Sequence, residues 1–250
     1  MKEKRLQQME EYIHSVGTVS LDELCERFQV SKNTIRRDVD TILEKGRVQK
    51  VYGGVTSISQ QLVPFERRDT TNLDEKVALG RTAARLVQDH DLIFIDSGTT
   101  ARNMMQFLPE LESLTILTNS LDVINAAAEL EFVKLITIGN HYKRSTKSFV
   151  GIDDLDILDK FNINKAFMAA TGVSIANGLT NSDILEYEIK KTIAGKAQEI
   201  YLLVDSSKLG KSTLLTYAPL EDVDGLITNA ELPEDYRRFC EEHGISVYLS

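Results

Sequence analysis

Seven short apolar segments between residue 92 and the C-terminus constrain the fold of this chain more than any other feature. Several are apolar at every position rather than at alternate positions, as expected for strands that are covered on both faces. Stretches with helical spacing separate them, such as Asp183–Lys196 and Pro233–His243. This alternation predicts an α/β fold with a mostly parallel sheet. The predicted strands are Leu92–Asp96, Leu114–Thr118, Lys134–Ile138, Ala166–Ala170, Ile200–Val204, Gly225–Thr228 and Ser246–Leu249.

The first 55 residues have a different pattern, in which apolar residues recur at helical spacing. One face of a first helix is expected to be formed by Leu6, Met9, Ile13 and Val16. Ser20 and Glu23 form a capping-box pattern, which predicts the start of a second, short helix. Ser31 is a suitable N-cap for a third helix. The buried stripe of that helix is expected to contain Ile35, Val39, Ile42 and Leu43.

The third predicted helix has a polar and basic face opposite its apolar stripe, made of Asn33, Arg36, Arg37 and Asp40. Two helices joined by a short turn, the second with such a face, are typical of a helix-turn-helix. In the major groove of DNA, arginine can form two hydrogen bonds with guanine, and asparagine can do so with adenine. Ser31, Lys32 and Thr34 lie near the N-terminus of the predicted helix, where contacts with DNA phosphates are expected.

A two-stranded wing is predicted directly after this helix. Gly46 would end the helix, and residues 47–55 then alternate in polarity. Such a wing would bring Lys50 and Tyr52 to the DNA backbone or the minor groove. The first part of the chain therefore has the organisation of a winged helix-turn-helix.

The charge of the chain is unevenly distributed. The net charge is −9, yet residues 1–55 hold ten Lys and Arg against nine Asp and Glu, and residues 27–50 hold seven against three. The negative net charge of the whole chain argues against a nucleic-acid partner. A locally basic segment on a large acidic body, however, suggests a nucleic-acid-binding head. The alternative interpretation is a solvated helix face, on which Asp38 and Asp40 neutralise the two arginines.

Small polar residues follow three of the predicted strands. The segments are Asp96-Ser97-Gly98-Thr99-Thr100, Thr118-Asn119-Ser120 and Asp205-Ser206-Ser207-Lys208. Each could be a helix cap or a turn when taken singly. Ligands of parallel sheets bind at the carboxyl ends of strands, and backbone N–H groups with hydroxyls form nests for anions there. Three such segments at corresponding places favour one shared site for an anionic ligand.

No metal or cofactor is predicted. Cys25 and Cys240 are the only cysteines, which indicates reduced thiols in a cytoplasmic protein rather than a disulfide scaffold. The four histidines have no metal-ligand spacing. Residues 209–212 resemble part of a phosphate-binding P-loop but lack its first glycine, and no dinucleotide motif follows a strand. The apolar runs are far shorter than the ~20 residues that a membrane crossing needs.

The head and the body both resemble one known family. Ser31-Lys32-Asn33-Thr34-Ile35-Arg36-Arg37-Asp38, followed by Val51-Tyr52-Gly53-Gly54-Val55, closely resembles the winged helix of the DeoR family of bacterial transcription regulators. The sensor domain of the same family is similar at five places in the body. These are Asp96-Ser97-Gly98-Thr99-Thr100, Thr118-Asn119, Phe149-Val150-Gly151, Gly178-Leu179-Thr180 and Asp205-Ser206-Ser207-Lys208.

This resemblance implies a fold and a ligand for the body. The sensor domain of the family is similar in fold to ribose-phosphate isomerases, and its inducers are usually phosphorylated sugars. By the resemblance, the phosphate would be held by Ser97, Gly98, Thr99 and Thr100. The sugar pocket would be lined by Asn119, Lys143, Arg144, Thr180, Glu186 and Lys208. The strand-end residues Asp96 and Ser120 complete the candidate effector site.

The sequence departs from an isomerase at two places. The isomerase lysine before its glycine run is missing, and Ile175-Ala176-Asn177-Gly178 stands in that region. The second place is the position of the isomerase base. Thr171 precedes Gly172, where many relatives carry an acid and the isomerases place a general base. Aldose–ketose isomerisation needs a carboxylate that moves a proton between carbons. The chain is therefore expected not to be an enzyme.

Within the family, five segments resemble the branch that represses myo-inositol catabolic operons. They are Ile138–Arg144, Ala169–Gly172, Leu179–Asp183, Glu186–Lys191 and Gly210–Pro219. The inducer in that branch is a phosphorylated deoxy-keto-gluconate, 2-deoxy-5-keto-gluconate 6-phosphate. The resemblance thus implies a repressor that a phosphorylated sugar acid releases from operator DNA.

The expected organisation is a winged helix-turn-helix over residues 1–56, a linker over 57–74 and an α/β effector-binding domain over 75–250. The expected partners are operator DNA, a phosphorylated sugar or sugar-acid inducer, and further copies of the chain in a dimer or tetramer, with no membrane. Three alternatives remain open: a sugar-phosphate isomerase with an accessory DNA-binding head, a repressor of a different sugar pathway, and a constitutive DNA-binding protein whose body only oligomerises.

Overall fold

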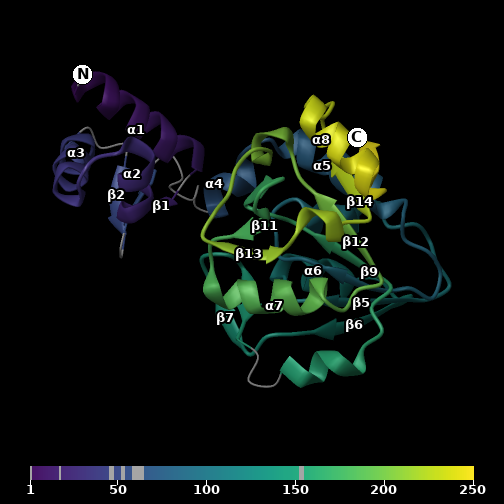
Figure 1. Ribbon diagram of the computed structural model, residues 1–250. Coiled ribbons are helices and arrows are strands. Elements are labelled where there is room, and N and C mark those ends of the chain that lie inside the picture. Colours follow the sequence, from purple (N-terminus) through teal and green to yellow (C-terminus); the bar gives the residue numbers. More distant parts are fainter. Residues whose placement is uncertain (1, 17, 45–47, 52–53, 58–64, 152–154) are drawn as a thin grey trace. The chain divides into compact units, whose positions relative to one another are not determined.

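The computed structural model describes residues 2–16, 18–44, 48–51, 54–57, 65–151 and 155–250 (Figure 1). Two compact units make up the chain. The first contains residues 1–63 together with 211–214, and the second contains residues 64–210 and 215–250. Residues 1–63 are called the head below, and the second unit is called the body.

The head is built from three helices and a small antiparallel sheet. The helices are α1 (Lys2–Val16), α2 (Leu21–Phe28) and α3 (Lys32–Glu44). The sheet has the strand order β1-β3-β2, with β1 (Thr18–Ser20), β2 (Val48–Val51) and β3 (Gly54–Ser57). The three predicted helices and the two-stranded wing are confirmed. Strand β1, which adds a third strand to the wing, was not predicted.

Single residues explain where α2 begins and ends and how closely β1 and β3 approach. The Ser20 hydroxyl accepts a hydrogen bond from the Glu23 N–H at 3.1 Å, as a helix N-cap should. Gln29 ends α2 in the left-handed region, with φ of 52°, so the chain turns sharply before α3. A Cβ atom at Gly54 would lie 2.2 Å from the Val19 carbonyl oxygen. Only glycine therefore allows β1 and β3 to approach this closely.

The body contains a seven-stranded sheet in which every neighbouring pair is parallel. Its order is β15-β14-β12-β9-β4-β5-β6. The strands are β4 (Leu92–Ile95), β5 (Leu114–Thr118), β6 (Val133–Thr137), β9 (Lys165–Met168), β12 (Glu199–Leu203), β14 (Gly225–Thr228) and β15 (Ser246–Leu249). All seven predicted strands are confirmed, and their ends differ from the predicted ends by at most two residues.

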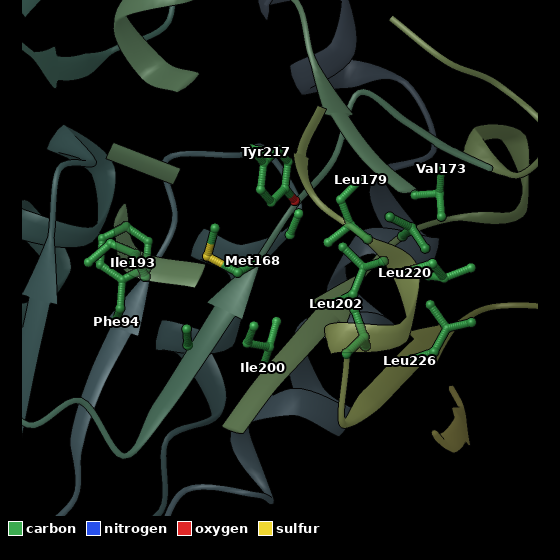
Figure 2. Close-up of a cluster of buried hydrophobic side chains, with 14 of the residues drawn as sticks. Phe94, Met168, Val173, Leu179, Ile193, Ile200, Leu202, Tyr217, Leu220 and Leu226 are labelled. Carbon is green, nitrogen blue, oxygen red and sulfur yellow. The ribbon is translucent and has the colours of Figure 1, made fainter. Parts of the chain in front are cut away.

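Apolar side chains cover both faces of this sheet, so the body has three layers. On β4, Phe94 belongs to one buried cluster, while Ile93 and Ile95 belong to the other. Figure 2 shows the first cluster, in which Ile193 packs near Phe94. Helices α7 (Ile184–Ala194) and α8 (Glu234–His243) contribute to that cluster. The opposite cluster includes residues of α5 (Leu73–Ala84), the 3-10 helix η2 (Ala101–Phe107) and α6 (Leu121–Ala127).

Smaller elements that the sequence did not predict complete the body. They are the antiparallel sheet of β10 (Gly172–Ser174), β11 (Gly178–Asn181) and β13 (Leu215–Ala218), the hairpin of β7 (His141–Lys143) and β8 (Ser148–Val150), the 3-10 helices η3 (Leu155–Lys160), η4 (Ser206–Lys208) and η5 (Leu220–Asp222), and helix α4 (Phe65–Thr70). Helix α4 and the start of α5 fall within the stretch expected to be a linker, residues 57–74. Among the described helices, none is both long and apolar enough to cross a membrane.

Candidate functional site

Helix α3 presents the face that the sequence predicted. Asn33, Arg36 and Arg37 are exposed, and Ile35 and Ile42 are fully buried. The apolar stripe therefore orients the helix, and the basic face is left open to solvent.

The two acids of this helix have different surroundings. Asp38 is buried, and its carboxylate accepts a hydrogen bond from Arg5 Nε of α1 at 2.7 Å. This hydrogen bond raises the pKa of Arg5. Asp38 therefore joins α3 to α1, and of the two acids only Asp40 lies on the exposed face. The alternative interpretation needed both Asp38 and Asp40 to neutralise the arginines of this face, and only Asp40 is available there.

The start of α3 is fixed by its own hydroxyl groups. Ser31 Oγ accepts a hydrogen bond from the Thr34 N–H at 3.3 Å and lies 3.0 Å from Thr34 Oγ1. Lys32 Nζ lies 2.5 Å from a carboxylate oxygen of Asp22 in α2. Ser31 and Lys32 are exposed, while Thr34 is half-buried. The predicted phosphate-contacting residues thus lie together at one end of α3.

The wing contributes a cation to the same surface. Lys50 Nζ lies 2.7 Å from Asp40 Oδ1, and both side chains are more than half exposed, at 65% and 56%. A cavity of about 200 Å³ lies beside this pair. It is lined by Leu21, Arg36, Val39, Asp40, Lys50, Gly54 and Val55. The wing and α3 therefore share one polar surface, whereas Tyr52 lies outside the described residues.

In the body, Asp96 at the end of β4 is part of a buried ion pair. Its carboxylate accepts hydrogen bonds from Lys190 Nζ of α7 and, at 3.0 Å, from the Ala169 N–H. Lys190 also donates to the Ala169 carbonyl oxygen at 2.9 Å, and Tyr217 Oη donates to that oxygen at 3.1 Å. Burial raises the pKa of Tyr217 well above its ordinary value, and the charge of Asp96 adds to this effect. Asp96 therefore joins β4, β9 and α7 at the base of the site.

The loop after Asp96 is tightly packed. Ser97, Thr99 and Thr100 are each 6% exposed. Asn103 Nδ2 donates to the carbonyl oxygens of Thr99 and Thr100, at 2.8 and 3.2 Å. A Cβ atom at Gly98 would lie 2.4 Å from the Ala169 Cβ. The close packing against Ala169, directly after β9, is therefore enough to require glycine at this position. The loop is thus shaped before any ligand binds, which suits the predicted anion nest.

The loop after β5 is bonded to the β7–β8 hairpin. The Phe149 N–H donates to the Asn119 carbonyl oxygen at 2.7 Å, and Asn119 Nδ2 donates to the Phe149 carbonyl oxygen at 3.1 Å. Asn119 Oδ1 is buried and has no hydrogen-bond partner among the described residues. Ser120 caps α6 by accepting from the Val123 N–H at 3.4 Å. Asn119 Oδ1 is therefore an acceptor that no described group occupies, while the Ser120 side chain has a capping role.

Glu186 of α7 lies in a cluster of buried polar side chains. Ser148 Oγ donates to Glu186 Oε1 at 3.2 Å, and Asn181 Nδ2 lies 3.3 Å from Glu186 Oε2. Thr171 Oγ1 lies 3.2 Å from Asn181 Oδ1. Thr171, which precedes Gly172, is thus a neutral hydroxyl bonded within this cluster.

Two other predicted pocket residues differ in their exposure. Lys143 forms an ion pair with Asp183, the N-cap of α7. Burial would raise the pKa of Asp183, but hydrogen bonds from Lys143 and from the Glu186 N–H outweigh it, and the pKa is lowered. Arg144 is exposed. Lys143 thus places a cation at the N-terminus of α7, the helix that carries Glu186.

The remaining predicted residues are Thr180 and Lys208. Thr180 is fully buried, and its hydroxyl donates to the Gly172 carbonyl oxygen at 2.9 Å, which holds β10 to β11. Lys208 Nζ lies 3.9 Å from Asp205 Oδ2, and its side chain is 25% exposed. Asp205 itself caps η4 through the Ser207 N–H at 3.0 Å. Lys208 is therefore a partly accessible cation at the end of β12.

Sequence reasoning missed several residues that organise this edge of the sheet. Lys190 looks like an ordinary helix lysine in the sequence but is 5% exposed. Ser148 and Asn181 lie on short strands that were not predicted. Capping and strand ends gave no signal for these three residues. The partners of Lys190 and Ser148, which are Asp96 and Glu186, are also distant in the sequence.

Comparison with known proteins gives consistent matches to both units. The DeoR-like helix-turn-helix domain matches residues 5–61, and the DeoR C terminal sensor domain matches residues 71–230. The HTH-type transcriptional regulator IolR of Bacillus subtilis (strain 168) is 58% identical over 251 residues, which cover 100% of each chain. The glycerol-3-phosphate regulon repressor of Escherichia coli (strain K12) is 28% identical over 240 residues, covering 96% of this chain and 95% of the relative.

Solved structures that resemble the chain include ribose 5-phosphate isomerase A from Methanocaldococcus jannaschii, with a TM-score of 0.40 and 21% identity over 56% of this chain and 55% of that one. The two domain matches cover most of the head and the body. The full-length relative shares more than half of its residues with this chain. The chain therefore belongs to the DeoR family of DNA-binding transcriptional regulators.

Proposed function

We propose that this chain is a repressor of a carbohydrate catabolic operon, which a phosphorylated sugar acid releases from its operator. One observation carries the proposal: an exposed basic helix face in the head accompanies a body whose strand-end loops contain hydroxyls, amides and cations. A ligand can shift the DNA-binding equilibrium only by its different affinity for the two states. The effector must therefore bind more tightly to the state with the lower affinity for operator.

In this proposal α3 lies in the major groove. Asn33, Arg36 and Arg37 read base edges, because these exposed side chains point away from the core. Ser31, Lys32 and Thr34 bind phosphates at the helix N-terminus. Lys50, and Tyr52 two residues after it in the sequence, contact the DNA backbone or the minor groove from the wing. Operators of helix-turn-helix proteins mirror the symmetry of the protein, so the chain acts as a homo-oligomer, a dimer or a tetramer.

The effector-binding roles are assigned from the position and the contacts of each side chain. The buried loop of Ser97, Gly98, Thr99 and Thr100 holds the phosphate, with Asp96 and Ser120 fixing the loops around it. Asn119, Glu186 and Lys143 bind the polar groups of the sugar, and Lys208 adds a cation at the end of β12. Arg144 lies at the exposed rim, and Thr180 supports the pocket from β11.

The controlled pathway is proposed to be myo-inositol catabolism, with 2-deoxy-5-keto-gluconate 6-phosphate as the inducer. The support is the resemblance of five segments to the myo-inositol branch and the 58% identity to IolR over the full length. A different sugar pathway would keep the same architecture with a different inducer. The identity of the active metabolite decides between them.

The test is a gel-shift assay with the full chain and the operator upstream of the inositol operon. The phosphorylated keto-acid is expected to release the DNA, and the same acid without phosphate is not, because the loop after β4 binds the phosphate. Equal potency of the two compounds would contradict the phosphate site. Turnover of sugar phosphates by the same preparation would instead support the isomerase alternative.

The sensor can be tested separately with Lys208→Ala. This change is expected to raise the inducer concentration needed for release while operator affinity without inducer stays the same. Loss of operator binding in the absence of inducer would show that Lys208 has a structural role.

A further inference from the structure

The two edge strands of the seven-stranded sheet are protected to different degrees. At one edge, β6 carries the exposed lysine Lys134, and a charge at this place hinders pairing of an edge strand with another chain. At the other edge, β15 contains no charged residue and no proline. Its side chains Val247 and Leu249 are 40% and 56% exposed. The β15 edge therefore lacks the features that keep an edge strand unpaired.

The open side of β15 is formed by the backbone of Val247 and Leu249. The N–H groups of Ser246 and Ser250 donate to carbonyl oxygens on the β14 side, at 2.9 and 3.0 Å. Because successive residues of a strand direct their N–H and C=O groups to opposite sides, those of Val247 and Leu249 point away from β14. In the part of the chain that the structure describes, no strand pairs with β15 on that side. Two donors and two acceptors thus line this edge.

A second copy of β15 that runs in the opposite direction fits this edge. With a two-fold axis at Tyr248, Val247 of one copy lies opposite Leu249 of the other. Each such pair exchanges two hydrogen bonds, so the two pairs use all four backbone groups of each copy. The exposed apolar side chains also become cross-strand neighbours, which stabilises an antiparallel pair. Pairing about a two-fold axis closes on itself, so association through this edge ends at a dimer.

Helix α8 has a charge pattern that suits the same symmetry. It directly precedes β15 and contacts it, so a two-fold axis at β15 sets the two α8 helices in opposite directions. Arg237 and Glu241 are both exposed. Among the described residues, the ion pairs of α8 join Glu234 to Arg237 and Arg238 and leave Glu241 without one. The acid of one α8 can therefore pair with an arginine of the other.

The position of the axis along α8 follows from the geometry of the two elements. Strand β15 begins at Ser246, and α8 ends just before it at His243. Tyr248 lies about 6.6 Å along the strand from Ser246, and a helix covers this distance in about four residues. The axis therefore passes α8 about four residues before His243, which is midway between Arg237 and Glu241. It brings Arg237 of one copy level with Glu241 of the other.

We propose that the open edge of β15, together with α8, is the surface through which two copies of this chain form a dimer. The inference rests on the homo-oligomer of the proposed function and names the surface that joins its copies. The two bodies then share one continuous sheet with two-fold symmetry. Each dimer carries two heads, as an operator with two half-sites requires.

The first test measures the dissociation constant of the full chain by sedimentation equilibrium. Leu249→Lys is expected to raise it about 100-fold, because a lost apolar contact is worth about tenfold and the symmetry repeats it. Thr137→Lys, at an exposed position of the β6 edge, is the control and should change it less than about twofold. If Leu249→Lys associates as the wild type does, β15 is not the interface.

The second test examines the register with cysteine variants. Val247→Cys chains mixed with Leu249→Cys chains and oxidised with diamide are expected to form a cross-linked dimer. Opposite Cα atoms in such a pair lie about 5.5 Å apart, which is within the range of a disulfide. Either variant alone should give no such cross-link, because equal positions are two residues out of register and more than about 7 Å apart. A cross-link of equal yield in either variant alone would overturn the antiparallel pairing.

A charge exchange tests the contact between the helices. Arg237→Glu and Glu241→Arg are each expected to weaken association about threefold to tenfold, and the double variant should recover most of the loss. Two single losses that add in the double variant would overturn the pairing of α8 with its copy. A wild-type chain that is monomeric at every concentration would remove the homo-oligomer of the proposed function together with this inference. An oligomer that persists in Leu249→Lys would remove only the β15 interface.

Discussion

The surface of α3 and the wing uses charged side chains in a different way from the buried end of β4 in the body. In the head, the pair of Lys50 and Asp40 is more than half exposed, and ion pairs of this kind contribute only about 0–1 kcal/mol. In the body, Lys190 and Asp96 are 7% and 1% exposed, and removal of one partner from such a pair costs about 3–5 kcal/mol. Lys50 thus stays accessible to solvent and to DNA phosphates, whereas Lys190 and Asp96 are fixed in place inside the body.

This difference matches the two kinds of ligand. DNA presents a regular row of phosphates, and its binding depends strongly on salt because counterions are released. A small effector must be distinguished from similar metabolites, which requires side chains that are held in place. The comparison predicts large effects of mutations on the stability of the body and smaller effects on that of the head.

The largest effect is expected for Lys190→Met. The variant leaves the Asp96 carboxylate buried without its cation, so the free energy of unfolding of the body should fall by about 3–5 kcal/mol. Thermal and urea denaturation of the full chain measure this loss. Lys191→Met, at the exposed neighbouring position, is the control and should change stability by less than about 0.5 kcal/mol.

A double variant of the same pair tests whether the stability loss of Lys190→Met comes from the unpaired charge of Asp96. In the double variant Asp96→Asn with Lys190→Met, no buried charge remains unpaired, so part of the lost stability should return. If the double variant is less stable than Lys190→Met alone, the loss arises from packing of α7 rather than from the charge of Asp96.

The next effect is on DNA binding by the head. Arg36→Ala should weaken operator binding by about 1–3 kcal/mol and relax preference at one base position, because this exposed side chain points away from the core. Fluorescence anisotropy at moderate salt, with the operator and with single-base variants, measures the change. Arg85→Ala is a matched control in the body. Wild-type affinity in both Arg36→Ala and Arg37→Ala would show that α3 does not read the operator.

A smaller effect is expected at the cap of α2. Ser20→Ala removes the acceptor of the Glu23 N–H and should destabilise the head by about 1 kcal/mol. The head transition in a urea titration, followed by circular dichroism, reports this change. Ser20→Asp keeps an acceptor at the same position and should retain most of the stability. Equal loss in the two variants would assign the effect to the β1 strand rather than to the cap.

The parts of the fold that the sequence predicts are those with a local signal. Each parallel strand is a continuous apolar run, and each helix of the head carries a stripe or a cap within its own residues. The antiparallel sheet escapes prediction because Leu179 of β11 pairs with Ala218 of β13, far along the chain. Lys190 and Lys191 are equivalent in the sequence, and only the packing of α7 shows which one is buried.

The candidate site shows the same limit. The loops after β4, β5 and β12 are recognisable because each carries its polar residues in one run. Helix α4 gives no such signal, because it lies in a polar stretch without a sustained period, which was expected to be a linker. The ion pair of its Asp69 with Arg102 depends on the fold of α4 against the loop after β4.

The smallest expected effect concerns the exposed pair of the head. Asp40→Asn removes the acid beside Lys50, so binding to unrelated DNA should strengthen by about 0.2–1 kcal/mol, the range of an exposed ion pair. Lys50→Ala should weaken binding to operator and unrelated DNA alike and lower the slope of the salt dependence by about one. Anisotropy titrations over a series of salt concentrations measure both changes. If Asp40→Asn leaves binding to unrelated DNA unchanged while Lys50→Ala weakens it, Lys50 contacts DNA without competition from Asp40. The Lys50–Asp40 pair would then contribute nothing to the preference for operator over unrelated DNA. The contrast with the Lys190–Asp96 pair would then be a difference in burial and not in function.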